Sequence, residues 1–178
     1  MRGQNKPDYP SEMSQHSSMD IHKKLIDLIA DFDQAMLVTR AANGALTSRP
    51  MAVAQVEDDG DLWFVTDRNS GKIADLILDQ DVAVTMQGSK KFVSLSGKAH
   101  AVDDQAKIDE LWNEAWKVWF PEGKTSPSLV LLRVEPTRGE YWDNAGLTGL
   151  KYLVKAGKAY LQGDRPEKDA SINAAVTM

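Results

Sequence analysis

The stretch "LWFVTDRNSGKIADL", residues 62–76, joins an apolar run to a helical pattern through small polar residues, a glycine and a lysine. Its first residues belong to types that favour strands. Further on, Ile73, Leu76 and Ile77 recur at the spacing of one helix face. Ser70 is a suitable N-cap for that helix. The stretch therefore predicts a buried strand followed directly by a short helix.

The junction between the two elements also has the composition of an anion site. A helix start leaves backbone N–H groups unpaired and carries the positive end of the helix dipole. Ser70 adds a hydroxyl, Gly71 lets a ligand approach the backbone and Lys72 adds a positive charge. Thr66 stands where a Walker A loop would need its first glycine, so the motif is not of that type. Two interpretations stay open: a structural cap in a turn, or a phosphate cradle.

A second polar element lies upstream in "SRPM", residues 48–51, inside a strand-like run. Pro50 has no N–H for a strand ladder, so we expect an edge, a bulge or a break in pairing there. Arg49 and Met51 point to the same face by strand alternation. Arginine forks onto phosphate oxygens. The alternative for Arg49 is an ordinary surface salt bridge.

Outward from these elements, alternating apolar residues and turn signals predict an antiparallel meander with a few inserted helices. We expect a mainly β fold, a six- to seven-stranded antiparallel barrel that is closed or partly closed. No G-x-G-x-x-G follows a strand, which disfavours a Rossmann fold. The expected strands cover residues 35–40, 45–56, 61–66, 81–87, 91–102, 128–136 and 138–144, with helices over 20–33, from 70 and over 104–120.

Length and composition indicate one globular domain. The chain has 178 residues, a net charge of -5 and no cysteine. The charge argues against nucleic-acid binding, and no apolar run approaches the length of a membrane span. We expect a cytoplasmic protein with a disordered arm over 1–18, a domain over 19–162 and a loose tail over 163–178.

The chain offers little catalytic chemistry of its own. His16, His22 and His100 show no metal-ligand spacing, and no nucleophile elbow is present. Any chemistry is therefore expected to reside in a bound cofactor. Trp142, in "EYWD" at a strand end, is interpreted equally well as a core residue or as a ligand wall.

Taken together, the ordered pieces "SRPM", "LWFVTDRNSGK", "VSLSGKAHAV", "WFPEG" and "EYWD" resemble the flavin-binding split-barrel proteins related to pyridoxamine 5'-phosphate oxidase. Among these proteins, the chain is most similar to the bacterial general stress protein branch. The resemblance covers about residues 20–160. It implies a split barrel that forms a homodimer, with one FMN in each of two clefts at the subunit interface.

The resemblance also implies roles for individual residues. Those expected to hold the FMN phosphate are Arg49, Ser70 and Lys72. Those expected to meet the flavin ring are Pro50, Met51, Val65 and Thr66. Trp142 would line the cleft from the partner subunit.

The chain departs from the true pyridoxamine phosphate oxidases at positions that form the vitamin site in those enzymes. Ala54 stands where those enzymes carry a lysine, and Phe92 where they carry a glutamine. No Arg-x-His pair follows Trp142. FMN binding is thus expected without pyridoxamine phosphate oxidation.

Several functions stay open at this stage. The first is flavin-dependent redox chemistry on a small substrate, with NADH or NADPH as electron donor. The second is a non-catalytic flavin-binding stress protein that acts as a sensor or a flavin store. A cofactor-free dimer and a heme- or deazaflavin-binding variant are further alternatives.

Overall fold

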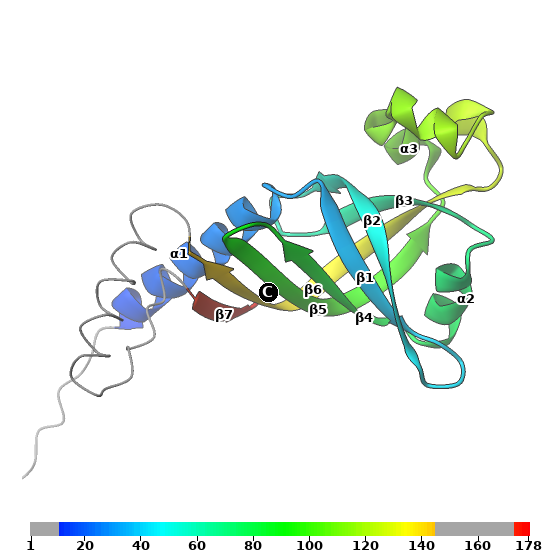
Figure 1. Ribbon diagram of the computed structural model, residues 1–178. Helices are drawn as coiled ribbons and strands as arrows, with labels where there is room; N and C mark the ends of the chain where they lie inside the picture. Colours follow the sequence, from blue (N-terminus) through cyan, green and yellow to red (C-terminus); the bar gives the residue numbers. More distant parts are fainter. Residues whose placement is uncertain (1–10, 145–172) are drawn as a thin grey trace, which may run out of the picture.

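The computed structural model describes residues 11–144 and 173–178 and shows a mainly β architecture (Figure 1). Six antiparallel strands form a barrel, and a seventh strand lies outside it. This confirms the expected fold class. The strands are β1 (Gln34–Arg40), β2 (Leu46–Val56), β3 (Leu62–Asp67), β4 (Asp81–Gln87), β5 (Lys91–Val102), β6 (Leu129–Asp143) and β7 (Asn173–Thr177).

The barrel follows from a meander whose two ends meet. The strand order is β3-β2-β1-β4-β5-β6-β7, and β3 also pairs with β6. Burial alternates along β1 and β4 as their sequences predict, since one face of each strand turns inward. Leu37, Phe64, Val84 and Leu95 are all fully or almost fully buried in the resulting core.

β2 and β3 pair over only part of their lengths. Their register runs from Val53↔Phe64 to Val56↔Leu62, with an irregularity between Val53 and Gln55. Farther along, β1 is the only partner of β2 among the described strands, and Pro50 lies in that part. A proline is tolerated there because no strand in the described part of the chain pairs with its open side, where its missing N–H would be needed. Of the three possibilities expected at Pro50, the structure shows an edge: β2 still pairs with β1 there, through Met36, while its β3 pairing begins only at Val53.

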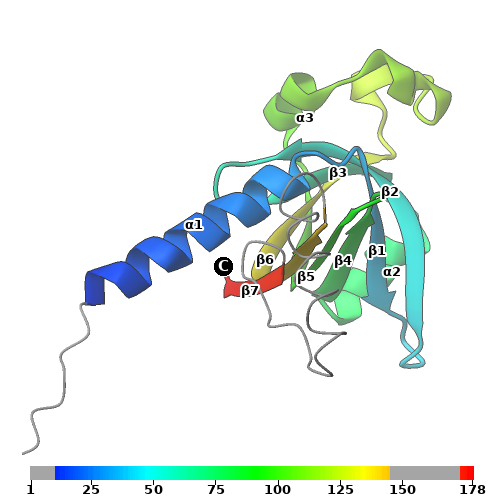
Figure 2. The same ribbon diagram turned by 60° about the vertical axis from the view of Figure 1, so that its left-hand side comes forward.

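Helical segments lie at both ends of the barrel. Figure 2 shows α1 beside β7, while α3 lies beyond the opposite end of the barrel. The helical segments are α1 (Ser11–Ile29), α2 (Gly71–Leu78) and α3 (Gln105–Leu111), with the short 3-10 segments η1 (Glu114–Val118) and η2 (Gly123–Thr125). None of the described helices is long and apolar enough to span a membrane.

The single helix expected over 104–120 is wrong. Asp104 does cap a helix, by accepting from Lys107 N at 3.1 Å, but α3 ends at Leu111. Asn113 then caps η1 by accepting from Ala115 N at 2.9 Å. A side chain that binds the backbone in this way starts a new segment and so interrupts the apolar periodicity.

Three further expectations, for β6 and for the two ends of the chain, also need correction. The two strands expected over 128–136 and 138–144, with a turn between them, are one strand: β6 runs continuously past Pro136, opposite a register shift at Ser96/Gly97 of β5. β7 pairs with β6, so its residues are not a loose tail. α1 begins at Ser11, inside the arm expected to be disordered. The expectations for 1–10 and 145–172 fall outside the described residues.

Candidate functional site

The site begins at the N-terminus of α2. Ser70 occupies the N-cap position with φ -71 and ψ 147, as expected, but its side chain makes no capping hydrogen bond. The Ser70 carbonyl accepts from Ile73 N at 3.0 Å, whereas its side chain satisfies none of the first-turn amides, such as those of Gly71 and Lys72. A Cβ added at Gly71 would meet no atom within 4 Å, so the backbone there is open to approach. Ile77 is 80% exposed and does not share the buried face that Ile73 and Leu76 form.

Lys72 connects this helix start to β3. Its Nζ donates to Thr66 Oγ1 at 2.6 Å and to Ser70 Oγ at 3.2 Å. Burial lowers the pKa of Lys72 from its ordinary value, the positive charge of Arg49 lowers it further, and Asp67 opposes the shift. The Lys72 ammonium thus lies half-buried near a second cation, with hydroxyl groups as its hydrogen-bond partners.

Arg49 reaches the same region from β2. Its Nη1 donates to Thr39 Oγ1 at 2.7 Å, and its Nη2 lies 3.3 Å from Asp75 Oδ2. Thr39 in turn donates to Asp75 Oδ2 at 2.7 Å and is almost fully buried. The salt bridge considered as the alternative for Arg49 is therefore present, and it fixes the guanidinium at the edge of the site. Arg49, Thr66, Ser70 and Lys72 together form what we call the cation cluster.

A cavity of about 500 Å³ opens beside the cation cluster, where β2 and β3 separate. We call it the β2–β3 cavity. Its described lining residues are Pro50, Met51, Ala52, Val65, Thr66, Asp67, Lys72, Trp116, Trp119 and Phe120. Most of the residues expected at a ligand site therefore meet at one place. Arg49 and Ser70 do not line the cavity itself but are linked to it through Lys72.

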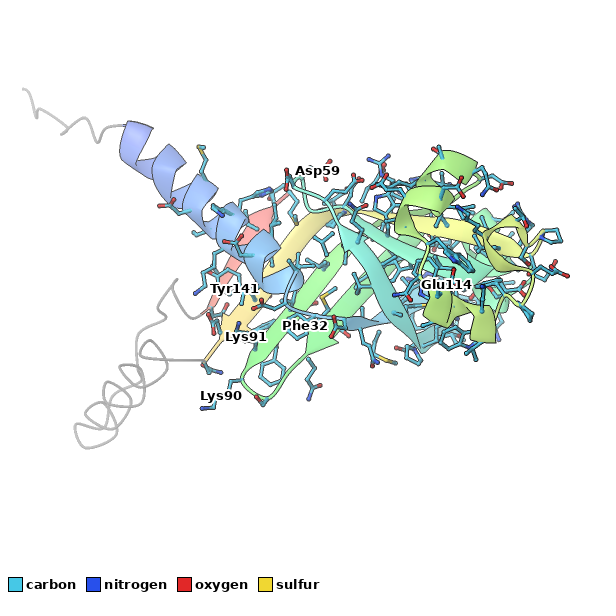
Figure 3. The ribbon with its side chains drawn as sticks, turned by 90° about the horizontal axis from the view of Figure 1, so that it is seen from above. Phe32, Asp59, Lys90, Lys91, Glu114 and Tyr141 are labelled. Carbon is cyan, nitrogen blue, oxygen red and sulfur yellow. The ribbon has the colours of Figure 1, made fainter. Side chains whose placement is uncertain are left out.

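Trp142 lies elsewhere in this chain. It sits near the end of β6, paired with Phe92 of β5 and Asn173 of β7, whereas the cavity borders the part of β3 that pairs with the start of β6. Figure 3 shows its neighbour Tyr141 beside α1, at the end of the molecule opposite Glu114 of η1. A single chain does not bring Trp142 to the cation cluster.

Sequence reasoning missed the aromatic side of the cavity. Trp116 and Trp119 fall within the single helix expected over 104–120, where helical spacing would place them on a packing face; instead the helix is interrupted at Asn113 and both line the cavity. The signal for this break was the asparagine between two apolar segments, which favours a cap. Asp75, the partner of Arg49, carried no local signal, because its role depends on the packing of α2 against β1.

A group of acidic residues lies away from this site. One oxygen each of Glu57, Asp59 and Asp61 lies within 4.8 Å of the others. Arg133 Nε donates to Asp61 at 2.6 Å, and Lys107 Nζ donates to Glu57 at 3.1 Å. Burial raises the pKa of Asp61 from its ordinary value. Glu57 and Asp61 are already engaged with cations, and Asp59 Oδ1 accepts from Asp61 N at 3.1 Å, so we assign the group a structural role.

The cation cluster suits an anionic ligand more than nucleophilic or metal chemistry. It combines a lysine, an arginine, hydroxyl groups and the first amides of a helix. Such groups donate hydrogen bonds to phosphate oxygens and lower the free energy of the bound dianion. The adjoining β2–β3 cavity offers apolar and aromatic side chains for the rest of a ligand.

Comparison with known proteins places the chain in one family. Residues 20–167 match the family described as pyridoxamine 5'-phosphate oxidase like. No curated protein matches the sequence.

Solved structures similar to this chain include general stress proteins. One from Jannaschia sp. CCS1, described as general stress protein 26, is 26% identical with a TM-score of 0.67, covering 90% of this chain and 99% of its own. The general stress FMN/FAD binding protein of Xanthomonas citri is 29% identical, with a TM-score of 0.61. The match covers 72% of this chain and 92% of that protein. General stress protein 26 of Bacillus anthracis shares the fold, with 24% identity and a TM-score of 0.59. The match covers 67% of this chain and 92% of that protein.

Proposed function

The chain belongs to the pyridoxamine 5'-phosphate oxidase-like family, and on this premise we propose that it binds FMN. The observation that carries the proposal is the position of Lys72 and Arg49 at the open start of α2, next to the β2–β3 cavity. A similar protein from Xanthomonas citri is described as FMN/FAD binding, which supports a flavin over heme or deazaflavin.

The donor groups of the cation cluster fit a phosphate monoester. Lys72 is half-buried and lies near the charge of Arg49, so an arriving dianion would relieve the repulsion between the two cations. Ser70 supplies a hydroxyl that is not used for capping, and Gly71 leaves room for a phosphate oxygen near the backbone. In this proposal the phosphate contacts the cluster and the flavin ring lies along Pro50, Met51, Val65 and Thr66.

We do not propose that the chain oxidises pyridoxamine phosphate. Ala54 is partly buried against the apolar cluster around Trp63, and Phe92 pairs with Trp142 in the β5–β6 ladder. Neither position supplies the polar group that the true oxidases carry there. The proposed activity is therefore flavin-dependent redox chemistry on another small substrate, and a bound flavin would supply the hydride or electron transfer. The alternative is a flavin-binding stress protein without turnover.

The proposal includes a homodimer. Because Trp142 lies far from the cavity of its own chain, it can line a flavin site only if a second copy presents it there. Mixing Lys72→Ala subunits, weakened in FMN binding, with Trp142→Ala subunits tests this directly. If each site is shared between subunits, one of the two sites in a mixed dimer contains both a native Lys72 and a native Trp142. FMN binding then returns to up to half of the sites.

The experiment that tests the binding itself is a titration of cofactor-free protein with FMN, followed by its visible spectrum and by calorimetry. Saturable binding at one FMN per chain supports the proposal, and failure to bind contradicts it. Rapid mixing of the loaded protein with NADH or NADPH then separates the two functions. Bleaching of the flavin, followed by reoxidation with an added electron acceptor, indicates an enzyme, whereas no reduction by either donor favours a sensor or store.

A further inference from the structure

The aromatic side of the β2–β3 cavity comes from one short segment. Trp116 belongs to η1, and Trp119 and Phe120 follow it directly. In Figure 1 this segment lies with α3 beyond the end of β3, away from α1. The cavity therefore has the cation cluster on one part of its boundary and a group of aromatic rings on another.

Ring packing and hydrogen bonds hold this segment in place. Trp112 and Trp116 pack edge to face, with ring centroids 5.8 Å apart and planes at 90°. Trp112 Nε1 donates to Glu114 Oε1 at 2.8 Å, which fixes the supporting ring. Phe120 is 4% exposed and belongs to the smaller core cluster, and its N donates to Trp116 O at 2.9 Å. Only Trp119 remains largely outside this packing.

Among the described residues that line the cavity, Trp119 is the large hydrophobic side chain that is exposed. Its side chain is 68% exposed, although it borders a cavity lined also by Met51 and Val65. The neighbouring Val118 is 78% exposed but does not line the cavity. A large indole left in solvent beside an anion site has apolar area to bury when a flat ring arrives.

We propose that Trp119 is a specificity-determining residue that contacts the ring system of the ligand within the same chain. The ligand class is then a planar, fused aromatic ring joined to a phosphate, with the phosphate at Lys72 and the ring against Trp119. This inference rests on the proposed FMN function and adds a contact beyond Trp142 of a second copy. It predicts that Trp119 contributes to the affinity for the ring, and that this contribution does not depend on whether the ligand carries a phosphate.

The test measures dissociation constants of FMN and riboflavin for four proteins: the parent chain, Trp119→Ala, Trp119→Phe and Val118→Ala. Loss of an aromatic contact should weaken both ligands by the same factor, roughly 3- to 10-fold. Trp119→Phe should retain most of the affinity, and Val118→Ala should match the parent. Tryptophan emission should be quenched less by FMN in Trp119→Phe than in the parent. Thermal melting confirms that each variant folds.

The outcomes separate this inference from the proposed function. If the parent binds neither ligand, the FMN proposal fails, and the inference fails with it. If the parent binds both and Trp119→Ala binds them equally well, only the Trp119 inference is overturned. An equal loss in Trp119→Ala and Val118→Ala, accompanied by a change in molecular mass, also overturns it, because the exposed pair would then act as a subunit contact.

Discussion

Arg49 of β2 and Asp75 of α2 form an ion pair, with Nη2 and Oδ2 3.3 Å apart, and both also bind Thr39. The pair ties the barrel to the helix whose start forms the site. It also leaves a permanent positive charge beside Lys72, and this charge lowers the pKa of that lysine. The contact thus links the packing of α2 to the electrostatics of the cation cluster.

The first prediction concerns Arg49 itself. Arg49→Ala should weaken FMN binding by about 1.5–3 kcal/mol, the range for a hydrogen bond to a charged group. Calorimetric titration of the cofactor-free variant measures this change. Arg40→Ala is the matched control, because it removes the same charge from β1, where Arg40 is half-exposed and pairs with Asp79 at 3.2 Å. An equal loss in both variants would show that only net charge matters.

A second prediction separates the binding of the FMN phosphate from the binding of the flavin ring. Lys72→Ala should weaken FMN strongly and riboflavin little, because only FMN carries the phosphate that the ammonium would contact. Parallel titrations with the two flavins measure the difference. Lys98→Ala serves as control, since Lys98 is exposed and paired with Asp81 at 2.8 Å. Parallel losses for FMN and riboflavin in Lys72→Ala would contradict the phosphate assignment.

The pH dependence of binding follows from the lowered pKa of Lys72. As pH rises, this ammonium loses its proton at a lower pH than an ordinary lysine of pKa 10.5, and the attraction for the phosphate is lost with the proton. FMN affinity should therefore fall on the alkaline side, while riboflavin affinity does not follow it. Lys72→Arg should remove this dependence, because a guanidinium stays charged. An identical pH profile in Lys72→Arg would exclude Lys72 as its source.

Local patterns were enough to predict much of the barrel. β4 and β5 have the bounds expected from the sequence, because alternation and turn residues act over a few positions. The helix start at Ser70 was likewise expected, since its capping chemistry is local. The strand edge at Pro50 was among the possibilities that the missing N–H of proline predicts.

Long-range pairing explains what the sequence did not predict. β7 is recognisable only through its ladder with β6, because a short run of small residues has no strong pattern of its own. β6 continues past Pro136 because Gly97 on β5 accommodates the register shift opposite it. At the site, the contacts of Asp75 with Thr39 and Arg49 depend on the folded barrel and not on spacing.

Gly97 leads to the last prediction. A Cβ at this position would overlap the carbonyl oxygen of Glu135 and lie 2.7 Å from Pro136 Cα. Both are backbone atoms of the neighbouring strand, so the strain cannot be relieved by rotation of a side chain. Gly97→Ala should therefore lower the free energy of unfolding by about 1–3 kcal/mol, the range for an overpacked interior. Urea unfolding of the cofactor-free protein measures this loss.

Gly71→Ala is the matched control for that substitution. A methyl group there would meet no atom within 4 Å, and it lies at the first position of α2, where alanine is tolerated. Its unfolding free energy should stay close to that of the parent. FMN affinity should fall instead, because the added methyl group would occupy the space left for the phosphate. A parent-like stability of Gly97→Ala would show that β5 and β6 can separate locally without loss, contrary to the close approach of Gly97 to Glu135 and Pro136.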